Sequence, residues 1–164
     1  MIWIDIDGVL INFIKTALKF GFKVKPNIFT GWRWRSEKGR NRFTANYPTP
    51  AEFYYIAEPQ PWFKNLINSI ERDRMAFITV DNSEVKQRWL REQLRSIGIE
   101  YGHNYGFYEC KDKSIYCKHP SDLLIDDNLE NCRKWKAKGG MAYHFNLAKK
   151  DPFGNFLKWW RLGK

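Results

Sequence analysis

Apolar residues in this chain gather in short runs that are separated by segments with a helical pattern. Five runs are rich in β-branched and aromatic residues and have the length of strands: 2–6, 76–80, 105–108, 123–125 and 141–145. Helical patterns occupy the segments between them: 9–20, 61–71, 84–97 and 129–138. Strands that alternate with helices form parallel sheets with crossover connections. The pattern therefore predicts an α/β domain with a parallel sheet of about five strands and helices on both faces.

The segment 84–97 has the clearest helical signature. Its apolar residues recur at helical spacing, at Val85, Trp89, Leu94 and Ile97. Ser83 is a predicted N-cap, because its hydroxyl can accept a hydrogen bond from an unpaired N–H of the first turn, and Gly98 is a predicted stop. Elsewhere Pro61 suits a first helical turn, and Gly139 and Gly140 end the segment 129–138.

Residues 22–59 interrupt the alternation of strands and helices. They are rich in turn-forming, aromatic and basic residues, and they separate the first predicted helix from the second unit of the sheet. We therefore expect residues 1–21 and 60–164 to form the α/β core, with 22–59 a small insertion that caps the site. The end of the chain, 153–164, is aromatic and basic and is predicted to pack as a short helix.

The composition indicates one folded domain. The 164 residues are 43% hydrophobic and 17% aromatic, which argues against a disordered chain. No stretch approaches the ~20 apolar residues of a membrane span. Asp5 and Asp7 would interrupt the core of a secretory signal, and the three cysteines, an odd number without C-x-x-C spacing, suit free thiols. We therefore expect a cytoplasmic protein that does not bind or span a membrane.

The chain is strongly basic. Its formal net charge is +10, from 28 basic and 18 acidic residues. Such an excess suggests an anionic partner, whether a nucleotide, a nucleic acid or another phosphorylated molecule. The alternative is that the charge serves solubility alone. Charge by itself does not separate free nucleotides from polynucleotides.

Two acidic pairs stand where apolar runs end. Asp5 and Asp7 stand at the end of the first run, and Asp126 and Asp127 follow the fourth. Ligands of an open parallel sheet bind beyond the carboxyl ends of the strands, where Thr79 also falls. Crowded carboxylates raise one another's pKa unless a cation compensates for their charge. The two pairs therefore predict one shared site for a hard divalent metal, with Mg²⁺ the expected ion.

These motifs resemble those of a known superfamily. The run Asp5-Ile6-Asp7-Gly8-Val9-Leu10, then a strand ending in Thr79, then a lysine, then Leu123-Leu124-Ile125-Asp126-Asp127, is similar to the haloacid dehalogenase (HAD) superfamily of phosphohydrolases. The resemblance runs from Trp3 to about Gly140 and leaves the insertion and the tail uncovered. It implies a Rossmann-like core with a small cap inserted after the first helix.

Within this superfamily the chain looks most like the small 5'(3')-deoxyribonucleotidases. The closest local resemblance lies in Lys111-Asp112-Lys113-Ser114 and in the segment 121–127. The chain departs from that family in two places. It has extra residues between Lys113 and Asp126, and it has Val80-Asp81 where a Ser-Pro pair is usual. Both departures bear on the substrate more than on the type of reaction.

The resemblance implies a role for each acid. Asp5 would be the nucleophile that attacks phosphorus and forms an aspartyl-phosphate. Asp7 would protonate the leaving alcohol and then take a proton from water. Asp5, the backbone carbonyl of Asp7 and Asp126 would ligate Mg²⁺, and Asp127 would support the ion or its waters.

The resemblance also implies which groups hold the phosphate. Thr79 would donate a hydrogen bond to a phosphoryl oxygen, and a lysine would neutralise developing charge. Lys113 fits this role best by its Asp-Lys-Ser context, and Lys111 and Lys118 are alternatives. Gly8 would let the backbone turn tightly and offer its N–H to the phosphate.

The insertion contains the alternating sequence Trp32-Arg33-Trp34-Arg35. Aromatic and guanidinium groups in alternation suit base stacking and phosphate pairing, so Arg33 and Arg35 are candidate substrate-binding residues. The alternative is a strand whose tryptophans pack inward and whose arginines face water. The three histidines form no pair or triad and are interpreted as structural.

These observations favour a Mg²⁺-dependent phosphomonoesterase that forms an aspartyl-phosphate, by resemblance a nucleotidase that hydrolyses (deoxy)nucleoside monophosphates. One alternative keeps the chemistry and changes the substrate, to the 3'-phosphate at the end of a polynucleotide. The positive charge and the Trp/Arg segment favour this alternative. A second alternative is a nucleic-acid-binding protein that has the fold without turnover, and the complete set of four aspartates argues against it.

Overall fold

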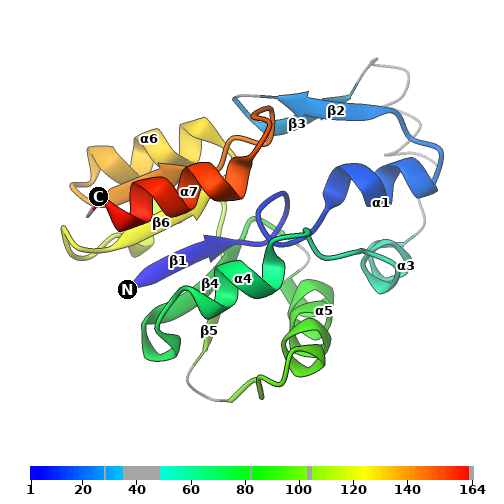
Figure 1. The fold of residues 1–164 in the computed structure, drawn as a ribbon, viewed down its shortest axis with the longest axis horizontal. Coiled ribbons are helices and arrows are strands. Elements are labelled where there is room, and N and C mark those ends of the chain that lie inside the picture. Colours follow the sequence, from blue (N-terminus) through cyan, green and yellow to red (C-terminus); the bar gives the residue numbers. More distant parts are fainter. Residues whose placement is uncertain (28, 35–48, 82, 103–104, 163–164) are drawn as a thin grey trace.

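A computed structural model describes residues 1–27, 29–34, 49–81, 83–102 and 105–162, and for residues 32–34 and 83 it describes the backbone alone. The centre of the fold is a five-stranded sheet in which every neighbouring pair is parallel, in the order β5-β4-β1-β6-β7 (Figure 1). Its strands are β1 (Ile2–Asp5), β4 (Met75–Thr79), β5 (Gly106–Glu109), β6 (Leu123–Asp126) and β7 (Met141–His144). The predicted α/β, Rossmann-like sheet is confirmed, and each strand lies within a residue or two of its predicted range.

Helices flank the sheet and cover its two faces with separate apolar clusters. Alternate residues of a strand point to opposite faces, so Ile2 and Ile4 of β1 enter one cluster and Trp3 enters the other. The larger cluster receives side chains from α1 (Phe13–Lys19), α4 (Phe63–Asn68), α5 (Ser83–Ser96) and α7 (Pro152–Arg161). The smaller one is closed by α6 (Leu129–Ala137), whose Trp135 is fully buried. Two short 3₁₀ turns complete the core, η1 (Arg72–Arg74) and η2 (Lys113–Tyr116).

The first predicted helix starts later than its apolar pattern indicates. The prediction places it over 9–20, but α1 begins at Phe13. Gly8 has a φ of +80°, and the carbonyl of Ile6 accepts hydrogen bonds from the N–H groups of Leu10 and Ile11, so residues 6–11 form a loop. Asn12 then caps α1. The apolar side chains of this loop are buried as a helix face would be, which explains the error.

Two other helix boundaries differ from the prediction. The segment 61–71 contains only the six residues of α4, because the chain turns at Ser69 before entering η1. Ser83 is the first residue of α5 and not its N-cap. Gly98 has a φ of +79° just after α5, as its predicted role as a stop requires.

The described part of the insertion consists of a hairpin and a helix. Strands β2 (Val24–Asn27) and β3 (Gly31–Trp34) pair antiparallel, and α3 (Pro50–Tyr55) begins with a capping box formed by Thr49 and Glu52. Phe53 of α3 is fully buried in the larger core cluster, with its ring 5.1 Å from that of Phe13. The insertion therefore shares the core of the α/β unit.

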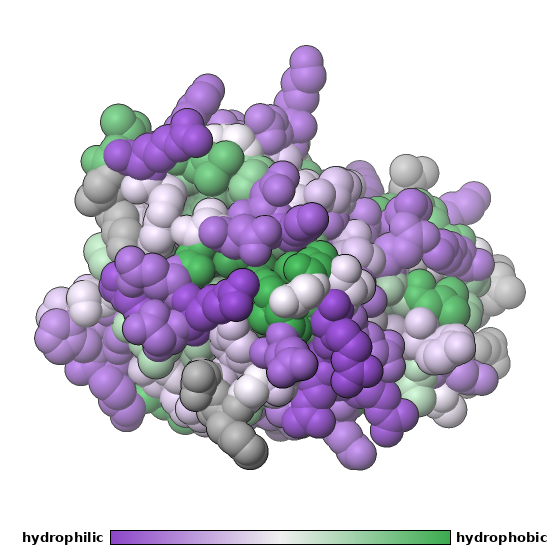
Figure 2. Space-filling view, turned by 60° about the horizontal axis from the view of Figure 1, so that its bottom comes forward, coloured by the Kyte–Doolittle hydropathy of each residue, from purple (hydrophilic) through white to green (hydrophobic). Residues whose placement is uncertain are grey.

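Figure 2 shows one face of the molecule, on which most side chains are hydrophilic and apolar areas lie near the centre and toward the edges. The cysteines Cys110, Cys117 and Cys132 are free thiols, as predicted. Within the residues that the structure describes, no helix is long and apolar enough to cross a membrane.

Candidate functional site

The two acidic pairs meet at the carboxyl edge of the sheet. Strand β1 lies between β4 and β6, so Asp5, Thr79 and Asp126 end neighbouring parallel strands at one edge. A cavity of about 270 Å³ opens there. It is lined by Asp5, Asp7, Thr30, Thr79, Val80, Lys113, Asp127, Asn128 and Asn131. The structure thus brings the predicted acids, Thr79 and Lys113 together.

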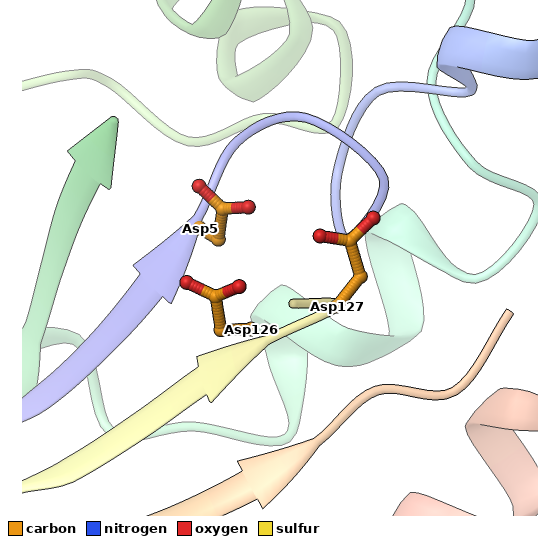
Figure 3. A group of neighbouring side chains, drawn as sticks. All are labelled: Asp5, Asp126 and Asp127. Atoms are coloured by element: carbon orange, nitrogen blue, oxygen red, sulfur yellow. The ribbon is translucent and has the colours of Figure 1, made fainter. Parts of the chain in front are cut away.

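Three carboxylates form the inner part of the site. One oxygen from each of Asp5, Asp126 and Asp127 lies within 4.8 Å of the others, and all three residues are buried (Figure 3). Burial raises the pKa of Asp5 to about 7, and the charges of Asp126 and Asp7 add to this rise while Lys113 opposes it. Burial also raises the pKa of Asp127, with Asp5 and Asp126 contributing. Repulsion between the acids thus adds to the effect of burial, in the direction that the sequence predicts.

Asp127 is the least satisfied of these acids. Its Oδ2 atom is buried and accepts no hydrogen bond from the residues that the structure describes. A buried carboxylate oxygen without a donor is costly, and a divalent cation ligated by the three acids would satisfy it. The donor set consists of carboxylate oxygens, the ligands that Mg²⁺ prefers. The residues present therefore fit a hard divalent ion.

Lys113 is the lysine that reaches the site. Its Nζ donates to Asp5 Oδ1 at 2.5 Å and to Asp126 Oδ2 at 2.7 Å, and its side chain is 2% exposed. Burial lowers the pKa of Lys113, but the charges of Asp126 and Asp5 outweigh that effect and the net shift is upward. Lys111 and Lys118, the two alternatives, are exposed and line no part of the cavity.

Asp126 is oriented by donors from its own turn. Besides Lys113, its carboxylate accepts from the backbone N–H of Asn128 at 2.7 Å and from Asn131 Nδ2 at 3.1 Å. Asn128 also caps α6 through Glu130 N, so it serves the helix and the site together. His144 lies in β7 with Nε2 3.1 Å from the Asp127 carbonyl, and burial lowers the pKa of its imidazole.

Two glycines make room for Asp127. Gly8 and Gly31 have φ values of +80° and +70°, and a Cβ built on either one would overlap the Asp127 carboxylate. Gly31 comes from the insertion, which docks here because Leu129 N donates to the Phe29 carbonyl and Thr30 bridges to Asn128. The N–H of Gly8 donates to the Ile11 carbonyl, so we assign Gly8 a steric role in this geometry.

A second buried lysine was not predicted. Lys86 Nζ lies 2.7 Å from Asp7 Oδ2 and 2.8 Å from both Thr79 Oγ1 and Asp81 Oδ1. Burial lowers the pKa of Lys86, but Asp7 and Asp81 more than compensate and the net shift is upward. The sequence does carry a signal for it, because Lys86 stands three and four residues before the buried Trp89 and Leu90 on α5. A lysine on the apolar face of a helix indicates a buried partner.

The two arginines of the insertion remain predictions. The backbone of Arg33 pairs with Lys25 in the hairpin, and its side chain is not described. Arg35 lies outside the described residues.

The site therefore has carboxylates that can ligate a cation, a nucleophile candidate beside an ammonium group, and a hydroxyl at the next strand end. Asp5, Asp7, Asp81, Asp126 and Asp127 outnumber Lys86 and Lys113, so this cluster carries net negative charge when the acids are ionised. No protein-family model and no curated protein sequence matches the chain, so the geometry of this site is the ground on which a function is assigned.

Proposed function

We propose that this protein is a Mg²⁺-dependent phosphomonoesterase that hydrolyses (deoxy)nucleoside monophosphates through an aspartyl-phosphate at Asp5. The observation that supports this most is the cavity at the carboxyl edge of a parallel sheet, which Asp5, Asp7, Asp127, Lys113 and Thr79 line, with Asp126 buried beside Asp5 and Asp127. The same residues carry the resemblance to the HAD phosphohydrolases. The cavity of about 270 Å³ is at the lower end of small-molecule sites, which suits a phosphoryl group.

Asp5, Asp126 and Asp127 would hold the metal ion. When bound, Mg²⁺ supplies positive charge that screens the repulsion between a carboxylate and the oxygens of a phosphate. Lys113 neutralises part of the same charge, because its Nζ is bonded to both Asp5 and Asp126.

In the first step an Asp5 oxygen forms a bond to phosphorus while the bond from phosphorus to the ester oxygen breaks. The leaving oxygen takes a proton from the Asp7 carboxyl and departs as an alcohol. In the second step water attacks phosphorus, Asp7 takes a proton from it, and the bond to Asp5 breaks. Asp5 is regenerated as a carboxylate and inorganic phosphate is released. Thr79 donates to a phosphoryl oxygen throughout.

A second candidate is the 3'-phosphate at the end of a single-stranded nucleic acid. Helix α6 starts at the cavity with Asn128 and Asn131 and continues with exposed basic residues, Arg133, Lys134, Lys136 and Lys138. Hydrogen bonds from Ser114 lower the pKa of Asp112, and Lys134 and Lys138 contribute to the same shift, which puts these lysines close to η2. A backbone that leaves the cavity along α6 would meet positive charge.

The test is release of inorganic phosphate from deoxynucleoside monophosphates and from 3'-phosphorylated oligonucleotides, each with Mg²⁺ and with EDTA. We expect release only when Mg²⁺ is present, and Asp5→Asn should abolish it while the protein remains folded. Turnover of oligonucleotides only would replace the first substrate class by the second. Salt-sensitive binding of single strands with no release from either substrate would overturn the proposal in favour of a binding protein.

A further inference from the structure

In the described part of the site, Lys86 is the charged side chain whose hydrogen-bond donors are all paired. Its side chain is 0% exposed, and an ammonium group buried without partners would be very costly. A lysine ammonium has three N–H donors. Lys86 has three acceptors, one on Asp7, one on Thr79 and one on Asp81, at 2.7, 2.8 and 2.8 Å. No donor is left over for a substrate.

We propose that Lys86 is a positioning residue that aims the Asp7 carboxyl at the leaving-group oxygen and directs the Thr79 hydroxyl hydrogen toward the phosphoryl group. The inference rests on the proposed phosphatase activity and assigns Lys86 a task that differs from that of Lys113. Lys113 lies in the cavity wall between Asp5 and Asp126, where it faces the reacting atoms. Lys86 lies behind Asp7 and Thr79 and does not line the cavity.

Asp7 needs such a partner because it stands in a loop. It follows the end of β1 and precedes α1, so it belongs to neither the strand nor the helix. Lys86 holds Oδ2, and the hydroxyl of Tyr54 donates to Oδ1 at 3.2 Å. Lys86 Nζ also lies 5.3 Å from the centre of the Tyr54 ring, so the two side chains support each other. The Asp7 side chain keeps 24% exposure, and Asp7 lines the cavity.

Lys86 also fixes the direction in which the Thr79 hydroxyl hydrogen points. Lys86 donates to Thr79 Oγ1, so the hydroxyl hydrogen must point away from Lys86. In this structure it is directed at the Asp81 carbonyl at 3.3 Å, which is long for a hydroxyl donor. A phosphoryl oxygen in the cavity can replace this weak contact. Thr79 then meets the substrate as a donor.

The experiment compares two substrates that differ in their need for an acid. The alkoxide that leaves a deoxynucleoside monophosphate requires a proton, whereas the nitrophenolate that leaves p-nitrophenyl phosphate does not. Lys86→Met removes the three N–H donors and keeps a side chain of similar length. Because kcat/KM covers the steps up to phosphoryl transfer, we expect it to fall about 100-fold or more on the nucleotide and much less on p-nitrophenyl phosphate.

Three controls make the result decisive. Lys86→Arg retains the charge and should restore part of the loss on the nucleotide. Tyr54→Phe retains the ring and removes one bond to Asp7, so it should shift the substrate ratio in the same direction by a smaller factor. Lys64→Met removes an exposed lysine of α4 that does not line the cavity, and it should leave the ratio unchanged.

If Lys86→Met lowers kcat/KM equally on both substrates, the role at Asp7 is overturned, because a misdirected Thr79 hydroxyl alone would affect both substrates alike. If Lys86→Met lowers kcat/KM on neither substrate, the whole inference is overturned. If Lys86→Met does not fold, an unchanged ratio in Tyr54→Phe overturns it instead. Wild-type protein that releases no phosphate from either substrate is a different failure, because it removes the proposed function and the inference with it.

Discussion

At the scale of single residues, the site is governed by how two buried ammonium groups are shared among the carboxylates. Lys113 serves Asp5 and Asp126, and Lys86 serves Asp7 and Asp81, while Asp127 Oδ2 receives no donor from the described residues. Burial raises the pKa of Asp5, and Lys113, which is shared with Asp126, offsets that rise only in part. The outcome is a cluster of acids that is not fully ion-paired and that could hold protons or a metal ion.

This charge balance predicts a link between pH, Mg²⁺ and stability. Burial raises the pKa of Asp5 from its ordinary value of 3.8 to about 7 in the fold, so between these values the folded state binds more protons than the unfolded state. The free energy of unfolding therefore falls as pH rises through this window. Mg²⁺ replaces the proton, so the rise in melting temperature on adding Mg²⁺ should be larger at about pH 8 than at about pH 5.

Differential scanning calorimetry with EDTA and with Mg²⁺ measures both effects. Asp5→Asn should show a shallower decline with pH in EDTA, because it lacks the titrating group. A melting temperature that rises with pH in EDTA, or a Mg²⁺ effect that is the same at both pH values, would contradict this interpretation.

At the scale of elements, three parallel strand ends and one hairpin build the site together. Strands β1, β4 and β6 contribute Asp5, Thr79 and Asp126 because their carboxyl ends lie at one edge. The β2–β3 hairpin contributes Gly31, whose missing Cβ leaves space for Asp127. The hairpin therefore shapes the candidate metal site from the insertion, and none of its described side chains belongs to the acidic cluster.

Replacing Gly31 tests this contribution, with Gly21 as a matched control. Both glycines have positive φ, at +70° and +75°, but a Cβ at Gly21 meets nothing within 4 Å. Gly31→Ala and Gly21→Ala should each lose about 1–2 kcal/mol of stability from the backbone conformation. Only Gly31→Ala should also weaken Mg²⁺ binding, by about 10–100-fold, because it displaces Asp127.

Isothermal titration calorimetry with Mg²⁺ separates the two variants. A Mg²⁺ affinity equal to that of the wild type in both Gly31→Ala and Gly21→Ala would show that the hairpin does not shape the site. A weakened affinity in both would assign the effect to general loss of stability.

At the scale of the whole molecule, a basic chain surrounds an acidic site. The net charge of +10 includes the aspartates of the site, so the rest of the surface is more basic still. Long-range attraction of this kind raises the rate at which an anionic substrate arrives, and it weakens with salt. The lysines of α6 are the described basic residues that lead away from the cavity.

Salt dependence distinguishes a polynucleotide end from a free nucleotide. Each phosphate contact on a single strand contributes about −0.7 to the slope of log K against log salt concentration. If oligonucleotides follow α6, the slope for a 3'-phosphorylated oligonucleotide should be steep, and Lys134→Ala with Lys138→Ala should reduce it. The same double variant should leave turnover of p-nitrophenyl phosphate unchanged. Equal slopes for mononucleotide and oligonucleotide in fluorescence-anisotropy titrations would rule out this path.

Much of the fold followed from local pattern. The five strands, the free cysteines and the meeting of Asp5 with Asp126 were predictable, because a buried strand is marked by its own residues and parallel strands end at a common edge. The start of α1 was missed, because a tight loop around Gly8 buries the same apolar side chains as a helix would. The roles of Arg33 and Arg35 remain predictions.

The sequence alone determined which chemical groups stand at the strand ends, since strand period and motif spacing are properties of neighbouring residues. Only the tertiary structure decided which lysine enters the site, that Lys86 supports Asp7 and Thr79, and that Gly31 makes room for Asp127. These contacts join residues from about seven to over a hundred positions apart, as in Lys86 with Thr79 and Lys113 with Asp5. Such partnerships depend on how the elements pack, and local spacing carries little information about packing.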